Sequence, residues 1–324
     1  MKRVLTGIKP TGEIQLGNYL GAIRQIINFQ RNYQVFLMIA DFHAQTVPYQ
    51  PKVLKNLTYD LAASLLALGV NPKKTIFFKQ SDVSAHLYLY WILGCLTYFG
   101  ELKRMHEFKE QSQRYRKEGV GSGIFMYPVL QAADILIYNA DIVPIGQDQI
   151  QHLELTRELA RRFNQKFKKF FKIPEIYLNE ETTKIMSLDN PTRKMSKSLP
   201  EGCLEIFGSE EKIKEKIFKA VTDSGNEIKY DPEKKPAISN LMVIYKFLTN
   251  KSLSEIEKEF NGLGYFDFKQ KIYEAFLSYF QEARLKKKKI SKNFIDKVLA
   301  QGAKKANKIA NQNLVKIMEI VGLK

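Results

Sequence analysis

The sequence predicts an α/β fold, with a parallel sheet in the first half of the chain and a mainly helical second half. Up to about residue 180, short β-branched or aromatic runs alternate with segments whose apolar residues recur every three or four positions. Beyond residue 209 the short runs fade and one helical pattern follows another. Alternating strands and helices form parallel sheets with right-handed crossovers, and such sheets bind ligands at the carboxyl ends of their strands.

The expected elements follow from these patterns. Four strands are expected in the first half, at residues 3–5, 35–40, 75–79 and 142–145. Five helices are expected beside them, at residues 17–31, 51–68, 85–98, 124–139 and 149–163. The second half is expected to hold helices at residues 210–221, 238–249, 254–260, 266–285 and 291–321. A chain of 324 residues, 44% of them hydrophobic, is long enough for two domains.

The charge balance favours a polyanionic partner. The formal net charge is +17, from 51 Lys and Arg against 34 Asp and Glu. Residues 281–324 hold twelve Lys and Arg against three Asp and Glu, including four consecutive lysines at 286–289. A surface of this kind follows the phosphates of a nucleic acid by releasing counterions. The alternative is a lysine-rich composition that only solvates the surface and the helix ends.

The cysteines and the N-terminus bear on the compartment. Cys95 and Cys203 cannot form a disulfide framework, and neither has a Cys or His neighbour at zinc-finger spacing, so a reducing cytoplasm is expected. The chain starts without the apolar stretch of a signal peptide, and no apolar run approaches the roughly 18 residues that span a bilayer. We therefore expect a cytoplasmic protein with no membrane partner.

Two short segments far apart in the chain suggest a nucleotide site. A glycine-rich turn, Gly-Ile-Lys-Pro-Thr-Gly at 7–12, leads through Gly17-Asn18 into a helical pattern, where backbone amides meet an anion at a helix N-terminus. Lys-Met-Ser-Lys-Ser at 194–198 supplies two ammonium groups that suit a loop closing on a polyphosphate. No lysine follows the glycine turn at Walker spacing, which argues against a P-loop enzyme.

Polar residues also interrupt two apolar segments. Tyr127, Gln131 and Asp134 share one face of an expected helix. A carboxylate on such an apolar face either has a structural partner or awaits an N–H from a ligand. Asp148, just after the strand at 142–145, either caps the next helix or accepts hydrogen bonds from ribose hydroxyls.

The histidines do not suggest a metal site. His43 ends a strand and is expected to face the same crevice as Asp134. His86 and His106 stand alone in the sequence and are interpreted as satisfied core or surface imidazoles. No Ser-His-Asp order or pair of catalytic carboxylates emerges either, which argues against hydrolases.

Taken together, these motifs resemble the bacterial-type tryptophanyl-tRNA synthetases, a family of class I aminoacyl-tRNA synthetases. The resemblance covers nearly the whole chain and rests on residues 7–12, 17–22, 127–136, 141–157, 194–198 and 220–225. It implies a Rossmann-type catalytic domain at 1–185 for ATP and tryptophan. Residues 186–324 would hold the Lys-Met-Ser-Lys-Ser loop and a helical domain that binds the tRNA anticodon. The implied reaction forms tryptophanyl-adenylate and transfers tryptophan to the 3′-terminal adenosine of tRNA(Trp).

The resemblance also assigns residues and partners. ATP would contact Lys9, Pro10, Thr11, Gly17, Asn18, Gly146, Gln147, Asp148, Ile185, Lys194, Met195, Ser196, Lys197 and Ser198. Tryptophan would contact Asp134, through its indole N–H, together with Tyr127, Gln149, Leu5 and His43. Catalysis would rest on Lys194, Lys197, Gln15 and Asn18, which position and stabilise charge without a covalent intermediate. Mg²⁺ would enter with ATP, no protein-bound metal is expected, and the assembly would be a homodimer.

Three positions depart from the family pattern. Gln15 replaces the Thr or His that usually opens the first motif, Gln111 stands where relatives often carry a lysine, and Leu5 stands where some carry Phe. Two other interpretations therefore stay open. One is a tyrosine-specific relative, which Asp134→Asn would distinguish because only a tryptophan enzyme would lose an acceptor for an indole N–H. The other is a basic RNA-binding protein that has kept the fold and lost catalysis, which the presence of Lys194, Lys197, Asp134 and Asp148 argues against.

Overall fold

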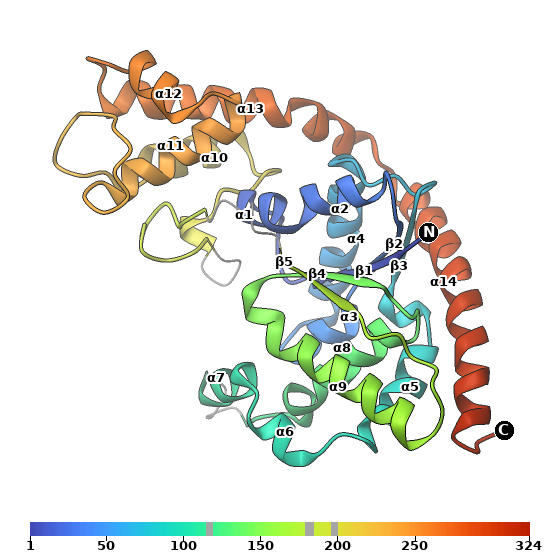
Figure 1. The fold of residues 1–324 in the computed structure, drawn as a ribbon. Helices are drawn as coiled ribbons and strands as arrows, with labels where there is room; N and C mark the ends of the chain where they lie inside the picture. Colours follow the sequence, from blue (N-terminus) through green and yellow to red (C-terminus); the bar gives the residue numbers. More distant parts are fainter. Residues whose placement is uncertain (115–118, 179–184, 196–199) are drawn as a thin grey trace.

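The computed structural model describes residues 1–114, 119–178, 185–195 and 200–324 of the chain (Figure 1). Its sheet has five parallel strands in the order β3-β2-β1-β4-β5. The strands are β1 (Arg3–Ile8), β2 (Gln34–Ile39), β3 (Thr75–Lys79), β4 (Ile142–Ile145) and β5 (Glu175–Leu178). The four expected strands are confirmed. The fifth, β5, was missed because it is short and its side chains are largely exposed, which leaves no apolar run.

Each strand of the sheet centre is buried on both faces. In β2, Val35, Leu37 and Ile39 pack in one apolar cluster, and Phe36 and Met38 in the other. This alternation follows from the two-residue period of a strand, and burial of both faces produces the continuous apolar run in the sequence. The first cluster also contains residues of α2 (Arg24–Phe29) and α4 (Pro51–Ala67), and the second those of α5 (Ala85–Gly94), α8 (Ser122–Leu136) and α9 (Ile150–Lys166).

The helices agree with expectation to within a few residues at most ends. The first expected helix, 17–31, is a continuous helical stretch built from α1 (Leu16–Asn18), a π-helical turn (Tyr19–Ile23) and α2. Three short helices were not expected: α3 (Asp41–Ala44), α6 (Phe99–Lys103) and α7 (His106–Arg114). They are too short or too polar to show a clear apolar period.

The second half is helical, as predicted, but its last helix returns to the sheet. The helices are α10 (Glu210–Lys219), α11 (Pro236–Thr249), α12 (Leu253–Glu259), α13 (Tyr265–Lys289) and α14 (Lys292–Ile320). Figure 1 shows α10–α13 grouped at one end of the molecule, whereas α14, in red, runs along the opposite side beside β3. The domain boundary at 185/186 stays a prediction. Although α14 follows this boundary in the sequence, it packs against elements that precede the boundary.

Small residues allow this return. Ala303, Ala306 and Ala310 of α14 are buried in the cluster that covers the second face of the sheet. A Cβ added to Gly302 would lie 1.7 Å from the carbonyl oxygen of Phe77 in β3. The side-chain amide of Asn307 donates to the carbonyl of Asp82 at 2.8 Å. The helix therefore covers the edge strand β3, an edge that proteins generally protect.

Candidate active site

The candidate site lies where the strand order reverses. The chain order runs outward from β1 to β2 and β3 on one side, and β4 pairs with the other side of β1. Ligands of open parallel sheets bind at such a switch point, outside the carboxyl ends of the strands. A cavity of about 280 Å³ opens there. Its lining includes Gly7 near the end of β1, Lys9 just after β1, Gly146 after β4, and the predicted Leu5, His43, Tyr127, Gln131, Asp134 and Gln149.

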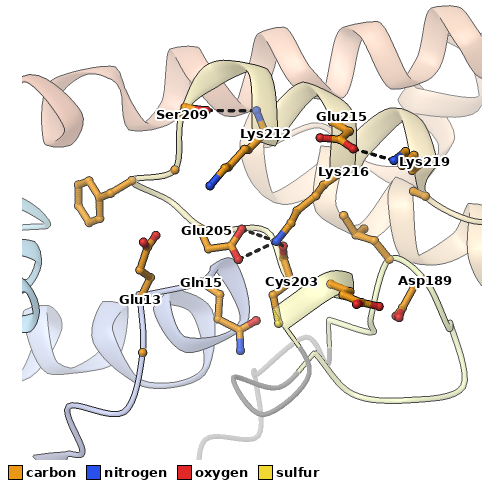
Figure 2. A pocket seen from close by; sticks show the side chains of 16 residues that line it. Glu13, Gln15, Asp189, Cys203, Glu205, Ser209, Lys212, Glu215, Lys216 and Lys219 are labelled. Carbon is orange, nitrogen blue, oxygen red and sulfur yellow. Dashed lines mark hydrogen bonds and ion pairs between the residues drawn. The ribbon is translucent and has the colours of Figure 1, made fainter. Parts of the chain in front are cut away.

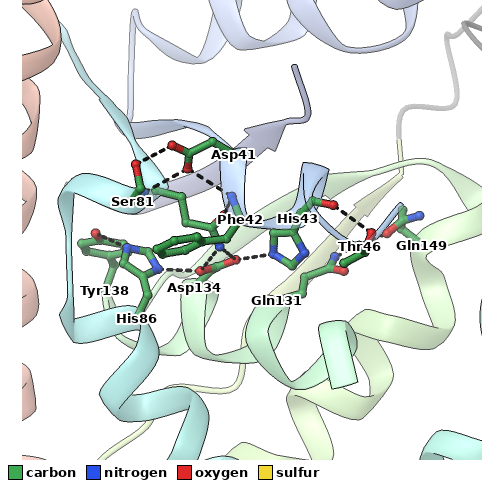
Figure 3. Close-up of polar contacts among 11 residues, drawn as sticks. Asp41, Phe42, His43, Thr46, Ser81, His86, Gln131, Asp134, Tyr138 and Gln149 are labelled. Atoms are coloured by element: carbon green, nitrogen blue, oxygen red, sulfur yellow. Dashed lines mark hydrogen bonds and ion pairs between the residues drawn. The ribbon is translucent and has the colours of Figure 1, made fainter. Parts of the chain in front are cut away.

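Asp134 is the most strongly held polar group at this cavity (Figure 3). Its side chain is only 1% exposed and accepts three donors from three other elements. His43 Nε2 lies 2.8 Å from Oδ2, His86 Nδ1 lies 2.5 Å from Oδ1, and Gln80 Nε2 lies 2.9 Å from both oxygens. The structural partners of Asp134 are therefore confirmed, and its contact with a ligand N–H stays a prediction at a residue that lines the cavity.

These donors keep the carboxylate ionised. Burial alone raises the pKa of a carboxyl group, but the two histidines and their hydrogen bonds outweigh it and hold the pKa of Asp134 below its usual range. A carboxylate accepts at about four lone-pair positions, and the three donors make four contacts because Gln80 Nε2 contacts both oxygens, so a ligand N–H would replace or share one of these contacts. Leu5, Met38 and Val143 give the cavity apolar walls.

Two loops after neighbouring strands place the donors. Asp41, which opens α3 after β2, accepts hydrogen bonds from the backbone N–H groups of Phe42 and Ser81 at 3.2 and 2.9 Å, and from the Ser81 hydroxyl. Gln80 Oε1 accepts the same Phe42 N–H at 3.2 Å, which turns its amide nitrogen toward Asp134. These contacts join the turn after β3 to the turn after β2 and fix His43 and Gln80 together.

Sequence reasoning missed Gln80 and the role of His86. His86 is a satisfied core imidazole, as expected, but its partners are Asp134 and the Tyr138 hydroxyl, which lies 2.9 Å from Nε2. The available signal was a histidine on the apolar face of α5, in line with the fully buried Leu89 and Leu93. His106 is exposed, as expected.

His152 forms hydrogen bonds with Tyr127 and Gln149, the two residues that are predicted to contact the substrate amino group. His152 is 2% exposed, with Nε2 lying 2.8 Å from the Tyr127 hydroxyl and Nδ1 lying 3.0 Å from Gln149 Oε1. Burial lowers the pKa of His152. A neutral imidazole has one donor and one acceptor, so Nδ1–H donates to Gln149 and Nε2 accepts the Tyr127 proton. These hydrogen bonds with His152 thereby orient the side chains of Tyr127 and Gln149.

The two nucleotide motifs are adjacent in the fold. Met195 is buried, and its backbone N–H donates to Ile185 at 3.1 Å. A Cβ added to Gly17 would lie 3.6 Å from Met195 Cβ and 3.7 Å from its carbonyl oxygen, which is ordinary contact. Glycine thus lets the start of the first helix approach the second motif. Lys194 is exposed, and Ser196, Lys197 and Ser198 lie outside the described residues, as does the Gln111 side chain.

Gln15 is buried with an unsatisfied amide. Its side chain is 1% exposed, and neither its Nε2 nor its Oε1 has a partner among the described residues. Its backbone pairs with Glu205, and its backbone N–H donates to the Asn18 side chain at 3.4 Å. Asn18 therefore closes the first turn of the helix, while the Gln15 amide retains unused hydrogen-bonding capacity.

Asp148 does not cap α9, which corrects one of its two interpretations. The residue that opens α9 is Gln149, and it has no side-chain cap. Asp148 is exposed, and its Oδ2 accepts the Gln149 amide at 2.9 Å. A Cβ added to Gly146 would lie 2.5 Å from Asp148 Oδ1, so a larger residue at 146 would require the carboxylate to move. The carboxylate remains open to solvent at the carboxyl end of β4.

A larger cavity of about 800 Å³ lies behind the first motif and shares no lining residue with the cavity at Asp134 (Figure 2). Its charged groups are partly paired, with Lys216 Nζ lying 2.7 Å from Glu205 and Lys219 Nζ lying 2.6 Å from Glu215. Over the described ranges, no cluster of three His, Cys, Asp or Glu side chains could hold a metal ion. Within the same ranges, no helix has the length and apolarity to cross a bilayer.

Known proteins match this chain over its length. Residues 1–281 match the sequence model of a family described as tRNA synthetases class I (W and Y). The tryptophan–tRNA ligase of Caldanaerobacter subterraneus subsp. tengcongensis is 46% identical over 325 residues, covering 100% of this chain and 99% of the relative. The chain belongs to this family. Within it the chain is of the bacterial tryptophan type, and its activity is tryptophan–tRNA ligation: activation of L-tryptophan with ATP, then transfer to tRNA.

Solved structures of the family agree. The tryptophanyl-tRNA synthetase of Mycoplasma pneumoniae superimposes with a TM-score of 0.90 at 36% identity, covering 100% of this chain and 98% of that one. The enzyme of Campylobacter jejuni, solved with ADP and tryptophan, gives a TM-score of 0.89 at 38% identity, covering 99% of each chain. The Rossmann-type fold of a class I synthetase is therefore confirmed for this chain.

Proposed function

We propose that this chain forms tryptophanyl-adenylate in the cavity between β1 and β4, with Asp134 accepting the indole N–H. The observation that carries the proposal is a buried, ionised carboxylate that lines a cavity with apolar walls. Leu5 and His43 contact the ring, and Tyr127 and Gln149, oriented by His152, receive the amino group. An amino acid without a ring N–H makes no such hydrogen bond to Asp134 and is selected against.

ATP is proposed to lie across the first motif, beside the substrate. Lys9, Pro10, Thr11, Gly17 and Asn18 contact the nucleotide, Asp148 with Gly146 and Gln147 holds the ribose, and Ile185 and Met195 border the adenine. The close approach of Gly17 to Met195 and the exposure of Asp148 support this arrangement. Ser196, Lys197 and Ser198 complete the nucleotide contacts.

Catalysis is proposed to rest on positioning and charge. The tryptophan carboxylate attacks the α-phosphate in line, and pyrophosphate leaves. Lys194 and Lys197 stabilise the negative charge that develops on the phosphates, and the unused amide of Gln15, with Asn18, borders the same phosphates. Mg²⁺ enters bound to ATP, because phosphate oxygens supply the hard ligands that this ion prefers.

The remaining proposals concern partners and compartment. tRNA(Trp) is the acceptor, and residues 186–324 bind its anticodon, in keeping with the positive charge of the chain. A homodimer is proposed because α5 and the segment after it expose large apolar side chains, which monomers rarely group together. These are Leu87, Tyr88, Trp91, Tyr98 and Phe99, with exposed fractions of 43–71%. Cys95 and Cys203 form no disulfide, which suits the reducing cytoplasm.

The test separates the two carboxylates of the site. ATP–pyrophosphate exchange without tRNA is measured for the wild type, Asp134→Asn and Asp148→Asn. A hydrogen bond to a charged group contributes about 1.5–3 kcal/mol, so Asp134→Asn should lower kcat/KM for tryptophan by about 10- to 150-fold and leave KM for ATP nearly unchanged. Asp148→Asn should raise KM for ATP and leave KM for tryptophan nearly unchanged.

The wild type is also tested with each of the twenty amino acids. Exchange with tryptophan alone is expected. Equal effects of both substitutions on both substrates would contradict the assigned roles, and an unchanged kcat/KM for tryptophan in Asp134→Asn would remove Asp134 from the indole site.

A further inference from the structure

We propose that His86 and Tyr138 are positioning residues for tryptophan selection, which hold the Asp134 carboxylate so that it faces the ring N–H of the substrate. The inference rests on the proposed role of Asp134 and extends it to two side chains that do not line the cavity. Nothing in their sequence positions assigns them to the site, since His86 stands alone and Tyr138 follows the last turn of α8.

The donors of Asp134 divide into a cavity side and a sealed side. His43 and Asp134 line the cavity, and His43 contacts Oδ2. His86 contacts Oδ1 from the other side and is fully buried, with an exposed fraction of 0%. Figure 3 shows His86 and Tyr138 on the side of the carboxylate opposite His43. A ligand can therefore replace or rearrange a contact at His43, whereas the contact at His86 is inaccessible.

With His86 as a neutral imidazole, the hydrogen bonds of this sealed side have one consistent proton arrangement. Because Oδ1 of an ionised Asp134 can only accept, His86 Nδ1 carries the proton of that contact. Nε2 is then an acceptor, and the Tyr138 hydroxyl 2.9 Å away donates to it. Burial raises the pKa of Tyr138 well above its usual range, so the hydroxyl keeps its proton. Tyr138 thus selects the imidazole tautomer that presents N–H to Asp134.

Tyr138 is itself immobilised. Its exposed fraction is 0%, and its ring packs 4.6 Å from that of Phe36 and 5.9 Å from that of Phe78, measured between centroids. Phe36 belongs to the inner strand β2 and Phe78 to the neighbouring strand β3, and both are buried. The line Tyr138–His86–Asp134 therefore connects the cavity to the buried core of the sheet, and rotation of the carboxylate would break a buried hydrogen bond.

The experiment uses two substrates that differ only in the ring N–H. ATP–pyrophosphate exchange is measured with L-tryptophan and with 3-(1-benzothiophen-3-yl)-L-alanine, in which sulfur replaces the N–H. The variants are His86→Leu, which removes the donor, His86→Asn, which keeps an N–H near the Nδ1 position, and Tyr138→Phe. Asp134→Asn is the reference, and thermal unfolding of each variant is recorded.

In His86→Leu, kcat/KM for tryptophan should fall about tenfold or more, mainly through KM, while the value for the sulfur analogue changes less than about threefold. His86→Asn should restore most of the preference for tryptophan. Tyr138→Phe should show a smaller loss of the same kind. If His86→Leu does not fold, His86→Asn compared with Tyr138→Phe carries the test.

The outcomes distinguish the proposed role of Asp134 from the proposed positioning role of His86 and Tyr138. If Asp134→Asn lowers activity equally with both substrates, Asp134 does not accept the ring N–H and the proposed function of the residue fails. If Asp134→Asn acts on tryptophan selectively but His86→Leu and Tyr138→Phe lower both substrates equally, the proposed function stands. His86 and Tyr138 are then only structural, and the positioning role is overturned.

Discussion

His152 lies between the two residues that are proposed to receive the substrate amino group, and its environment makes a pH prediction. Burial lowers its pKa in the folded chain, whereas the unfolded chain has the ordinary value of about 6.5. Below pH 6.5 the unfolded chain therefore binds a proton that the folded chain does not, and stability is lost as the pH falls.

The free energy of unfolding should consequently depend less on pH in His152→Gln than in the wild type. Between pH 7.5 and 5.5 the wild type should lose about 1 kcal/mol more than the variant, because glutamine does not titrate. Urea denaturation at the two pH values measures the difference. Parallel pH profiles of the two proteins would mean that His152 is not kept neutral by the fold.

At the scale of single residues, the sequence predicted several side chains that line the cavity but not the side chains that hold Asp134 in place. Tyr127, Gln131 and Asp134 were found because their spacing places them on one helix face, and all three line the cavity. Gln80, His86 and Tyr138 come from other elements, and their distance from Asp134 in the sequence hides their contact. Helical spacing reports neighbours on one element, while a hydrogen bond between elements depends on packing.

Among the elements, α14 has the tightest packing constraint. The backbone of Gly302 lies against β3, where an added Cβ would meet the carbonyl oxygen of Phe77 at 1.7 Å. Gly302→Ala should therefore destabilise the chain by about 1–3 kcal/mol through overpacking, although alanine is the better helix former.

Gly21→Ala is the matched control. It lies in a helical stretch, and an added Cβ would find no atom within 4 Å, so the substitution should be neutral or slightly stabilising. Thermal unfolding of the two variants against the wild type tests the contrast. A Gly302→Ala chain as stable as Gly21→Ala would show that α14 does not press on β3.

The elements themselves were largely predictable, and their partners were not. Strands buried on both faces show as continuous apolar runs, so β1–β4 were found, whereas the exposed edge strand β5 gave no such run. The pattern at 291–321 predicted a helix there, and α14 (Lys292–Ile320) agrees. The small residues of α14 did not predict that this helix covers the sheet edge. Apolar spacing indicates that one face of a helix is buried, but it does not identify the element that packs against that face.

The proposed homodimer makes a prediction about the exposed apolar side chains around α5. Trp91 is 71% exposed, so Trp91→Glu should place a charge in the proposed subunit interface and convert the dimer to monomers. Phe266→Glu, at a side chain 70% exposed in α13, should leave the dimer intact. Sedimentation equilibrium distinguishes the species. A monomeric wild type, or a dimer that survives Trp91→Glu, would place the interface elsewhere or remove it.

The interaction with tRNA is also a property of the whole molecule. Lys286, Lys288 and Lys289 are exposed at the end of α13, whereas Lys287 lies 2.6 Å from Asp60 of α4 and is left in place. If the three exposed lysines contact phosphates, replacing them with Gln should reduce the slope of log K against log salt by about 2–3.

A control with the same change of net charge is available at three other exposed lysines, Lys73, Lys74 and Lys169. Their replacement with Gln should alter the slope by less than one unit. Filter binding of tRNA(Trp) over a range of salt concentrations measures both. Equal slopes in the two triple variants would mean that the end of α13 only solvates a helix terminus.

The sequence by itself determined the α/β order of the chain, the four main strands, the two nucleotide motifs and the face that carries Asp134. These are local properties, because the periodicity of strands and helices and the glycine-rich turns depend only on residues that are close in the sequence. Only the tertiary structure decided which groups hold Asp134, that Met195 lies against Gly17, and that α14 closes the edge at β3. Each of these is a contact between segments that are distant in the sequence. Such a contact forms only when those segments pack together around the two faces of the sheet.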